Sequence, residues 1–200
     1  MIRSTLIALV ATTSLGGCAL LSSPDPVQNY RFGSPSLAPA AEPGPNTPQV
    51  VLRRVEFPSA VEGDRILGVT GTETAYIKGA RWVSPAEDLY SESLENAFAT
   101  QATRVRAIGA REVVQGGQTL DIDIRAFEAR YDAPGATPTA VISARAQLLA
   151  LPGREVKAER TFTIQQPASE NRVGAIVEAF DRATSDLNSQ IVAWTEQNAN

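Results

Sequence analysis

The 200-residue chain contains no histidine and only one cysteine, and these two shortages exclude many common site chemistries. Without histidine there can be no Ser-His-Asp triad, no Cys-His dyad and no histidine metal ligand. One cysteine cannot form an internal disulfide or a zinc site built of cysteines alone. What remains is carboxylate or lysine chemistry, or a protein that binds and positions something.

An excess of positive charge is also absent. The chain carries 18 Lys and Arg against 22 Asp and Glu, a formal net charge of −4. Proteins that bind nucleic acid normally present a basic face, so this balance argues against a nucleic-acid partner. Hydrophobic residues make up 43% of the chain, and its length is typical of one domain.

The first residues have the pattern of a bacterial export signal. Arg3 supplies a positive charge, residues 6–15 are mostly apolar, and Gly16, Gly17 and Cys18 follow. The apolar run is shorter than the roughly 20 residues that a membrane-spanning helix needs. Residues 15–18 also resemble the lipobox of bacterial lipoproteins. We therefore predict a signal peptide over 1–17; the alternative is a plain signal peptide with an incidental cysteine.

Cys18 is the predicted lipidation site, carrying acyl chains such as palmitate. Several such chains would hold the mature chain, residues 18–200, on a membrane. By resemblance to lipoprotein sorting in enteric bacteria, an aspartate after the cysteine favours inner-membrane retention. The next residue here is Ala19, so the expectation is a lipid anchor in the outer membrane, facing the periplasm.

The segment that follows Cys18 has the composition of a tether. Residues 19–48 hold seven of the thirteen prolines, with Ser, Ala and Gly between them. Such a segment favours extended conformations and does not build a core. We predict a disordered tether over 18–48 and a folded domain over 49–200. Tyr30 and Phe32 are the exceptions, because aromatics in a tether either dock somewhere, as partner or ligand contacts, or are incidental.

The first part of the expected domain predicts two strands. Residues 49–57 are rich in β-branched and aromatic side chains and lie between Pro48 and Pro58. Residues 73–78 predict a second short strand, after a stretch containing three glycines.

A helix should follow these strands. Ser84 is placed to cap it, Pro85 to take its first position, and Glu87 lies three residues after the cap. The helix should end near Gln101. Residues 105–114 are ambiguous and compatible with a short strand.

The second part of the domain predicts three sequential strands and a long helix. Residues 120–131 alternate between apolar and polar side chains, and the apolar phase shifts by one residue near 126, as a β-bulge would produce. Residues 139–151 and 155–164 predict the next two strands. After these strands, mostly apolar side chains recur at alternating spacings of four and three residues, which predicts one face of a long helix that packs on a sheet. This stripe consists of Val173, Val177, Phe180, Thr184, Leu187, Ile191 and Trp194.

These elements predict an α+β fold. We expect a mostly antiparallel sheet of four to five strands, with two helices packed on one face and a disordered tether before it.

Three features are candidate sites, each with a structural alternative. Asp121 and Asp123 share one face of a strand, as acid/base or metal-binding carboxylates would, but Arg125 on the same side favours a solvated charged face. Trp82, just before a helix, is a candidate partner or ligand contact, although packing under the helix end is favoured. The stripe of the last helix is expected to pack within the chain and not on a partner. No residue is predicted as catalytic or as a metal ligand.

Several short motifs follow one another along the chain: Cys18, an aromatic near Tyr30, Phe57-Pro58, Ala80-Arg81-Trp82, the helix start from Pro85 to Leu89, Ile124-Arg125-Ala126-Phe127-Glu128, and Leu187 with Ile191-Val192-Ala193-Trp194. In this order they resemble the ABC-type transport auxiliary lipoprotein family, the PqiC-like auxiliary components of MCE-type lipid transport systems. The family's usual Tyr-Tyr-Thr-Leu after the cysteine is reduced here to Asn29-Tyr30-Arg31-Phe32.

The resemblance implies a protein without catalytic activity or cofactor. Its partners would be an MCE-domain protein and the permease and ATPase of an ABC transporter that moves phospholipid or other hydrophobic molecules between membranes. Self-association is compatible with this role. A second hypothesis, from a different class, is a structural or assembly lipoprotein that partners an outer-membrane barrel.

Overall fold

The computed structural model describes residues 26–33, 44, 46–109 and 117–199. The signal peptide and Cys18 lie outside these residues, as do 34–43, 45 and 110–116. The elements, in chain order, are β1 (Gln28–Tyr30), β2 (Gln49–Leu52), β3 (Arg65–Thr70), β4 (Glu73–Trp82), α1 (Ala86–Gln101), β5 (Arg106–Gly109), β6 (Gln118–Tyr131), β7 (Thr139–Ala150), β8 (Glu155–Pro167) and α2 (Val173–Asn198).

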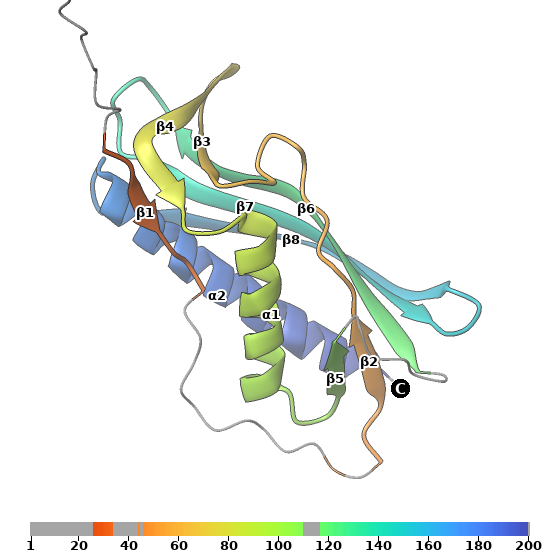
Figure 1. Ribbon diagram of the computed structural model, residues 1–200. Coiled ribbons are helices and arrows are strands. Elements are labelled where there is room, and N and C mark those ends of the chain that lie inside the picture. The colour runs from red at the N-terminus through yellow and green to blue at the C-terminus, as the bar shows by residue number, and fades with distance from the viewer. Residues whose placement is uncertain (1–25, 34–43, 45, 110–116, 200) are drawn as a thin grey trace, which may run out of the picture.

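All eight described strands join one curled sheet (Figure 1). β6, β7 and β8 form an antiparallel meander of long strands. On its other side β6 pairs in parallel with β2 near its beginning and with β3 near its end. The antiparallel β3–β4 hairpin and the parallel pairings of β1 with β4 and β2 with β5 complete the sheet.

The sheet differs from the expectation of four to five mostly antiparallel strands. It is mixed and has eight strands among the described residues, because short segments far apart in the chain pair in parallel. β1 and β3 were not expected, and β5 occupies four residues of the ambiguous stretch 105–114. β2 ends at Leu52, and only an isolated bridge between Glu56 and Asp123 continues the expected strand over 49–57.

The β-bulge in the longest strand is confirmed. The register of β6 on β7 shifts between Ile124 and Ala126, where the apolar phase of the sequence changes. As a result Ile122 and Ile124 before the shift and Phe127 after it are all at most 3% exposed. The bulge therefore keeps one buried face continuous along a strand whose sequence changes phase.

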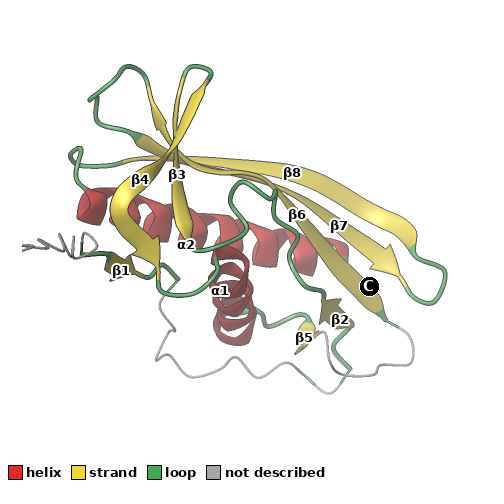
Figure 2. Cartoon of the chain, turned by 45° about the horizontal axis from the view of Figure 1, so that its top comes forward, coloured by secondary structure: helices red, strands yellow, loops and turns green. Residues whose placement is uncertain are grey.

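The two helices lie on the same side of the sheet (Figure 2). α2 packs along β7 and β8, and α1 packs against α2 and β5. The predicted stripe of α2 is buried from Val177 to Trp194, and only its first member, Val173, is half-buried. The stripe packs within the chain, as expected, because β7 and β8 offer it an apolar face.

The predicted capping role of Ser84 is wrong. Pro85 itself occupies the cap position of α1, and no side chain there bonds the backbone. The first N–H of the helix, that of Ala86, is instead satisfied by the carbonyl oxygen of Gly63 at 2.9 Å. The loop before β3 therefore supplies the partner that a serine cap normally provides.

The folded unit begins before the expected boundary at residue 49. β1 lies within the segment expected to be a tether, yet it pairs with β4 in the register Gln28 to Ala80 and Tyr30 to Trp82. Phe32 just after it is fully buried. Tertiary pairing thus overrides a composition that by itself favours an extended, unpacked chain.

Candidate functional site

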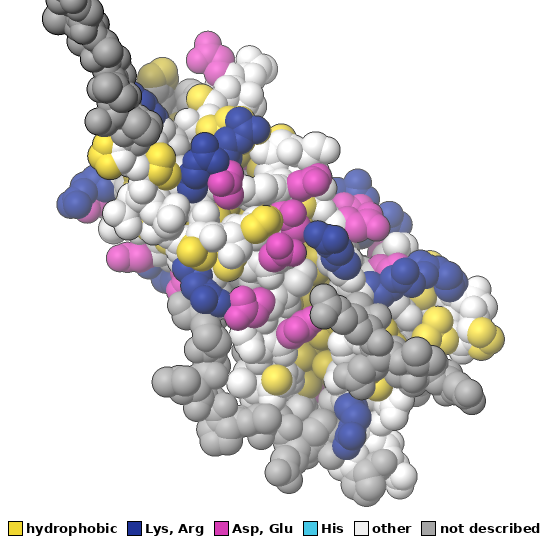
Figure 3. Space-filling view, viewed as in Figure 1, with side chains coloured by type: hydrophobic (Ala, Val, Ile, Leu, Met, Phe, Trp, Pro, Cys, Tyr) yellow, Lys and Arg dark blue, Asp and Glu magenta, His cyan; other side chains and the backbone are white. Residues whose placement is uncertain are grey.

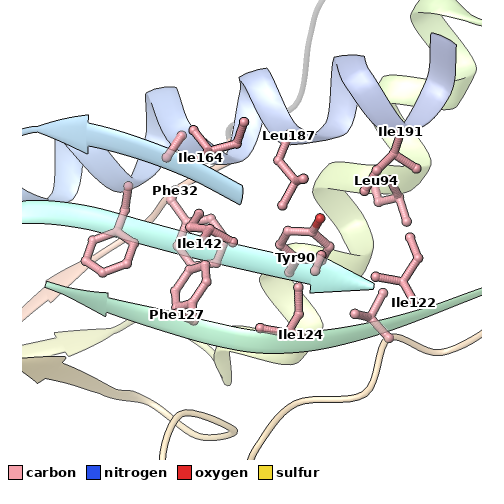
Figure 4. Packing of buried hydrophobic residues seen from close by; sticks show 14 of the residues in the cluster. Phe32, Tyr90, Leu94, Ile122, Ile124, Phe127, Ile142, Ile164, Leu187 and Ile191 are labelled. Carbon is pink, nitrogen blue, oxygen red and sulfur yellow. The ribbon is translucent and has the colours of Figure 1, made fainter. Parts of the chain in front are cut away.

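An aromatic cluster at the centre of the molecule contains two of the three residues predicted as contacts. Phe32 and Trp82 lie edge to face with ring centroids 4.9 Å apart, and both pack near Phe127. Figure 4 shows Phe32 among buried side chains from β6, β7 and α2. Because Phe32 is 0% and Trp82 2% exposed, neither side chain presents surface to a partner or ligand; both hold the core together.

Tyr30, the third predicted contact, is half-buried and packs at the edge of this core. Its carbonyl oxygen accepts a hydrogen bond from the backbone N–H of Val83 at 2.8 Å, which extends the β1–β4 pairing by one bond. Of the three, only Tyr30 keeps part of its side chain at the surface.

Polar contacts fix the end of the docked segment. The guanidinium of Arg31 donates to both carboxylate oxygens of Glu92 on α1 at 2.8 Å. The N–H of Gly33 donates to Asp181 of α2 at 2.7 Å. The segment 28–33 therefore contacts β4 and both helices, and it is an integral part of the domain.

Gly33 is a structurally constrained position that sequence reasoning did not single out. Its φ of +65° is one that L side chains rarely adopt, and a Cβ there would lie 2.5 Å from the Cβ of Ser93. Only glycine fits here. The signal in the sequence is weak: a glycine directly after an aromatic in a proline-rich stretch.

A small polar cavity lies next to Gly33, between α1 and α2. It has a volume of about 170 Å³, and its lining includes Ser93, Asn96, Asp181 and Asn188. Asn188 donates to the hydroxyl of Ser93 at 2.9 Å, and its own side-chain oxygen and the amide nitrogen of Asn96 have no partner within the protein. The space can hold a few water molecules, which would satisfy these atoms.

A larger cavity of about 400 Å³ opens at the end of the sheet formed by the β3–β4 and β6–β7 hairpins. Its lining includes Gly68, Ala75, Ile77 and Tyr131, with Glu73 as a charged side chain. Partial burial raises the pKa of the Tyr131 hydroxyl above its usual value. Apart from Glu73 the lining is uncharged and combines glycine, alanine and threonine residues with Tyr76, Ile77 and Tyr131, and the cavity is open to solvent.

The paired carboxylates on β6 are held in ion pairs. Asp121 accepts a hydrogen bond from Arg154 at 2.9 Å and lies 3.6 Å from Arg53, and Asp123 lies 2.6 Å from Arg125. This arrangement is the charged face favoured by the sequence. Figure 3 shows acidic and basic side chains interspersed over the face of the molecule in view.

The described part of the chain holds no cluster of three or more residues able to ligate a metal ion. No helix in that part is long and apolar enough to cross a membrane. Cys18 is outside the described residues, so its lipidation stays a prediction.

Comparison with protein families gives one match that covers most of the domain. Residues 30–192 match the model of the "ABC-type transport auxiliary lipoprotein component". The chain belongs to this family. The match begins at Tyr30, the last residue of β1, so it includes residues 30–33 of the docked segment.

Solved structures share the fold of this auxiliary lipoprotein. A crystal structure of a Xanthomonas campestris protein is 27% identical, with a TM-score of 0.70, and the match covers 82% of this chain and 93% of that one. An uncharacterized protein is 16% identical, with a TM-score of 0.64 over 78% and 98% of the two chains. A hypothetical protein of Chlamydia trachomatis is 12% identical, with a TM-score of 0.52 over 76% and 97%. No curated protein matches the chain.

Proposed function

We propose that this protein is a non-catalytic, lipid-anchored auxiliary subunit of an MCE-type ABC transporter that moves phospholipid or other hydrophobic molecules between two membranes. The observation that carries the proposal is the family match over residues 30–192, on a chain whose residues 15–18 resemble a lipobox. The acyl chains would anchor the domain to the outer membrane, on its periplasmic side.

The features of the folded domain support a role in binding and positioning. The paired carboxylates Asp121 and Asp123 are held by Arg154 and Arg125, so neither is set up as a free acid or base. The centre of the described part of the chain is a packed aromatic core, with Phe32 and Trp82 at most 2% exposed. We therefore expect the surface of the domain to carry its function.

A lipid anchor suits such a role for a physical reason. Confining a module to one membrane raises its effective concentration near a partner held in the same space, without any added contact. The proposed partners are the MCE-domain protein that forms the conduit and, through it, the permease and ATPase.

Co-purification of the full-length protein in mild detergent tests this proposal. An affinity tag after Asn200 avoids the anchor, and an unrelated outer-membrane lipoprotein with the same tag is the matched control. We expect MCE, permease and ATPase subunits with this protein and not with the control. Recovery of an outer-membrane barrel alone would overturn the proposal in favour of a barrel-assembly role.

A second measurement separates docking from direct cargo binding. Lipids are extracted from the purified protein after its own acyl chains have been accounted for by mass spectrometry. Stoichiometric phospholipid in the extract supports binding of cargo by this subunit. An empty domain, together with recovery of the MCE subunit, supports docking alone.

A further inference from the structure

The docked β1 strand fixes where the anchored end of the chain leaves the domain. β1 runs parallel to β4, and the carbonyl oxygen of Pro26 lies 3.9 Å from the position of a Cβ on Gly79. The strand begins beside the first turns of α2 (Figures 1 and 2). Pro26, and not residue 48, is therefore the point from which any anchor at Cys18 must be reached.

The chain between the anchor and this point is short. Eight residue steps separate Cys18 from Pro26, and a fully extended chain of that length spans at most about 29 Å. Residues 34–48 connect β1 to β2, so they add nothing to this reach. The sequence alone suggested a tether of about thirty residues with roughly three times this reach.

The exit point lies toward one end of an elongated domain. The side-chain amide of Asn171, just before α2, donates to the carbonyl oxygen of Gly135 in the β6–β7 hairpin at 3.1 Å. Thr70 at the tip of β3 pairs with Tyr131. Both hairpins and the beginning of α2 thus form a single end, the hairpin end of the molecule. β1 begins next to the first turns of α2 (Figure 2), opposite Ala80 near the end of β4.

The opposite end is too distant to face the same membrane. The 26 residues of α2 span about 39 Å, and the 12 residues of β7 span about 40 Å from the β6–β7 hairpin to the β7–β8 turn. With the β7–β8 turn against the bilayer, the exit point would lie farther from the surface than the eight-residue connection can reach. That orientation is excluded if Cys18 carries the anchor.

We infer that the hairpin end faces and contacts the surface of the bilayer that holds the anchor, leaving the β7–β8 end for a partner in the periplasm. This inference rests on the lipidation of Cys18 in the proposed function. The surface chemistry of the hairpin end agrees with it. Its open cavity of about 400 Å³ is lined by Tyr76, Tyr131, Ile77 and several Gly, Ala and Thr residues, with Glu73 as one acidic side chain. Val27, just before β1, is 49% exposed. Tyrosines with one apolar and one polar side are favoured at the membrane interface.

Energy transfer from labels at the two ends of β7 tests the orientation. Ala133→Cys in the β6–β7 hairpin and Gly153→Cys in the β7–β8 turn are both at exposed positions. The Cβ at residue 153 would meet no atom within 4 Å. Full-length lipidated protein, labelled with a donor dye at one site, is reconstituted into phosphatidylethanolamine–phosphatidylglycerol vesicles that contain an acceptor-labelled lipid. Because the sites are about 40 Å apart, we expect at least about twofold higher transfer from residue 133.

A longer connection provides the matched control. A Gly-Ser insertion of about twenty residues between Asp25 and Pro26 would raise the maximum reach to roughly 100 Å, which should reduce the difference between the two labels. Equal transfer from both labels without the insertion, or higher transfer from residue 153, would overturn the inferred orientation. Protein that does not float with the vesicles would instead overturn the anchor, and with it the proposed localisation.

Discussion

Phe32 meets the indole of Trp82 edge to face, with ring centroids 4.9 Å apart, although Trp82 lies fifty residues further along the chain. This contact ties a segment with the composition of a linker into the centre of the domain. It also decides the length of the connection to Cys18, and thereby how closely the proposed anchor would hold the domain to a membrane. We therefore expect substitutions along this segment to affect both stability and the distance between the domain and that proposed anchor.

Truncating Phe32 should strongly destabilise the fold. Phe32 is 0% exposed and contacts two other aromatic rings, so Phe32→Ala should lower the free energy of unfolding by about 3–5 kcal/mol. Denaturant unfolding followed by tryptophan fluorescence measures this. Val27→Ala, at a side chain 49% exposed, is the control and should change stability little. A loss below about 1 kcal/mol for Phe32→Ala would mean that the segment is not docked in solution.

Gly33 should tolerate no side chain. Gly33→Ala places a Cβ 2.5 Å from that of Ser93 at a φ of +65°, and we expect a loss of about 1–3 kcal/mol. Adding Ser93→Gly removes the clash but not the strain of the positive φ, so it should restore only part of the stability. Gly153→Ala, in open space, is the matched control. Full recovery in the double variant would show that the backbone angle costs nothing.

Removing the hydroxyl of Tyr90 should not destabilise the protein. This hydroxyl is buried without a hydrogen-bond partner, and burial raises its pKa well above the ordinary value. Because an unpaired buried hydroxyl carries a desolvation cost, Tyr90→Phe should raise the free energy of unfolding by about 1 kcal/mol. Thermal unfolding of the two proteins measures the shift. A clear loss of stability would point to a hydrogen bond in solution, through a bound water.

The stability of the β7–β8 pair should decrease at acidic pH. Arg145 donates to both carboxylate oxygens of Glu159, at 2.9 and 2.7 Å, and holds the pKa of that carboxyl below its usual range. The stabilisation is therefore full above the unfolded pKa of about 4.3 and is lost as pH falls through the lower folded value. A titration followed by NMR should place the Glu159 midpoint below that reference. Arg145→Ala should raise this midpoint, and an unchanged value would show that the pair does not form in solution.

Cys18 should determine membrane attachment. Cys18→Ser removes the thiol that would carry the acyl chains, so the variant should appear as a soluble or unprocessed form after membrane fractionation. Mass spectrometry of the purified native protein should show acyl chains on Cys18. Ala19→Ser keeps the cysteine and provides the control. A Cys18→Ser variant that stays processed and membrane-bound would contradict the lipoprotein interpretation.

Local patterns in the sequence were sufficient to predict the long strand β6 and the long helix α2. The alternation of apolar and polar side chains in β6, its shift near Ala126 and the apolar stripe of α2 each arise from a repeat that a single element creates by itself. The paired carboxylates Asp121 and Asp123 could likewise be read as a charged face, because Arg125 lies on the same side of the strand.

Two of the short strands, β1 and β3, could not be predicted in this way. β1 has three residues and β3 crosses Gly68, so neither contains enough of a repeat to stand out from a loop. β1 exists because β4, far away in the chain, offers it a backbone partner. β3 pairs with the adjacent β4 in a hairpin and, at its end, with the distant β6. The parallel pairings that make the sheet mixed depend on the same non-local contacts.

The sequence by itself determined the absence of histidine chemistry, the long helix and the bulged strand, and it carries the prediction of a lipobox at Cys18. These depend on composition or on repeats within one element. Only the tertiary structure decided that residues 28–33 belong to the domain. The physical reason is that Phe32 gains its burial from Trp82 and Phe127, which lie far away in the sequence and meet it only once the sheet has formed. Because of that contact, Cys18 is joined to the folded domain by eight residue steps and not by the tether of about thirty residues that the sequence suggested.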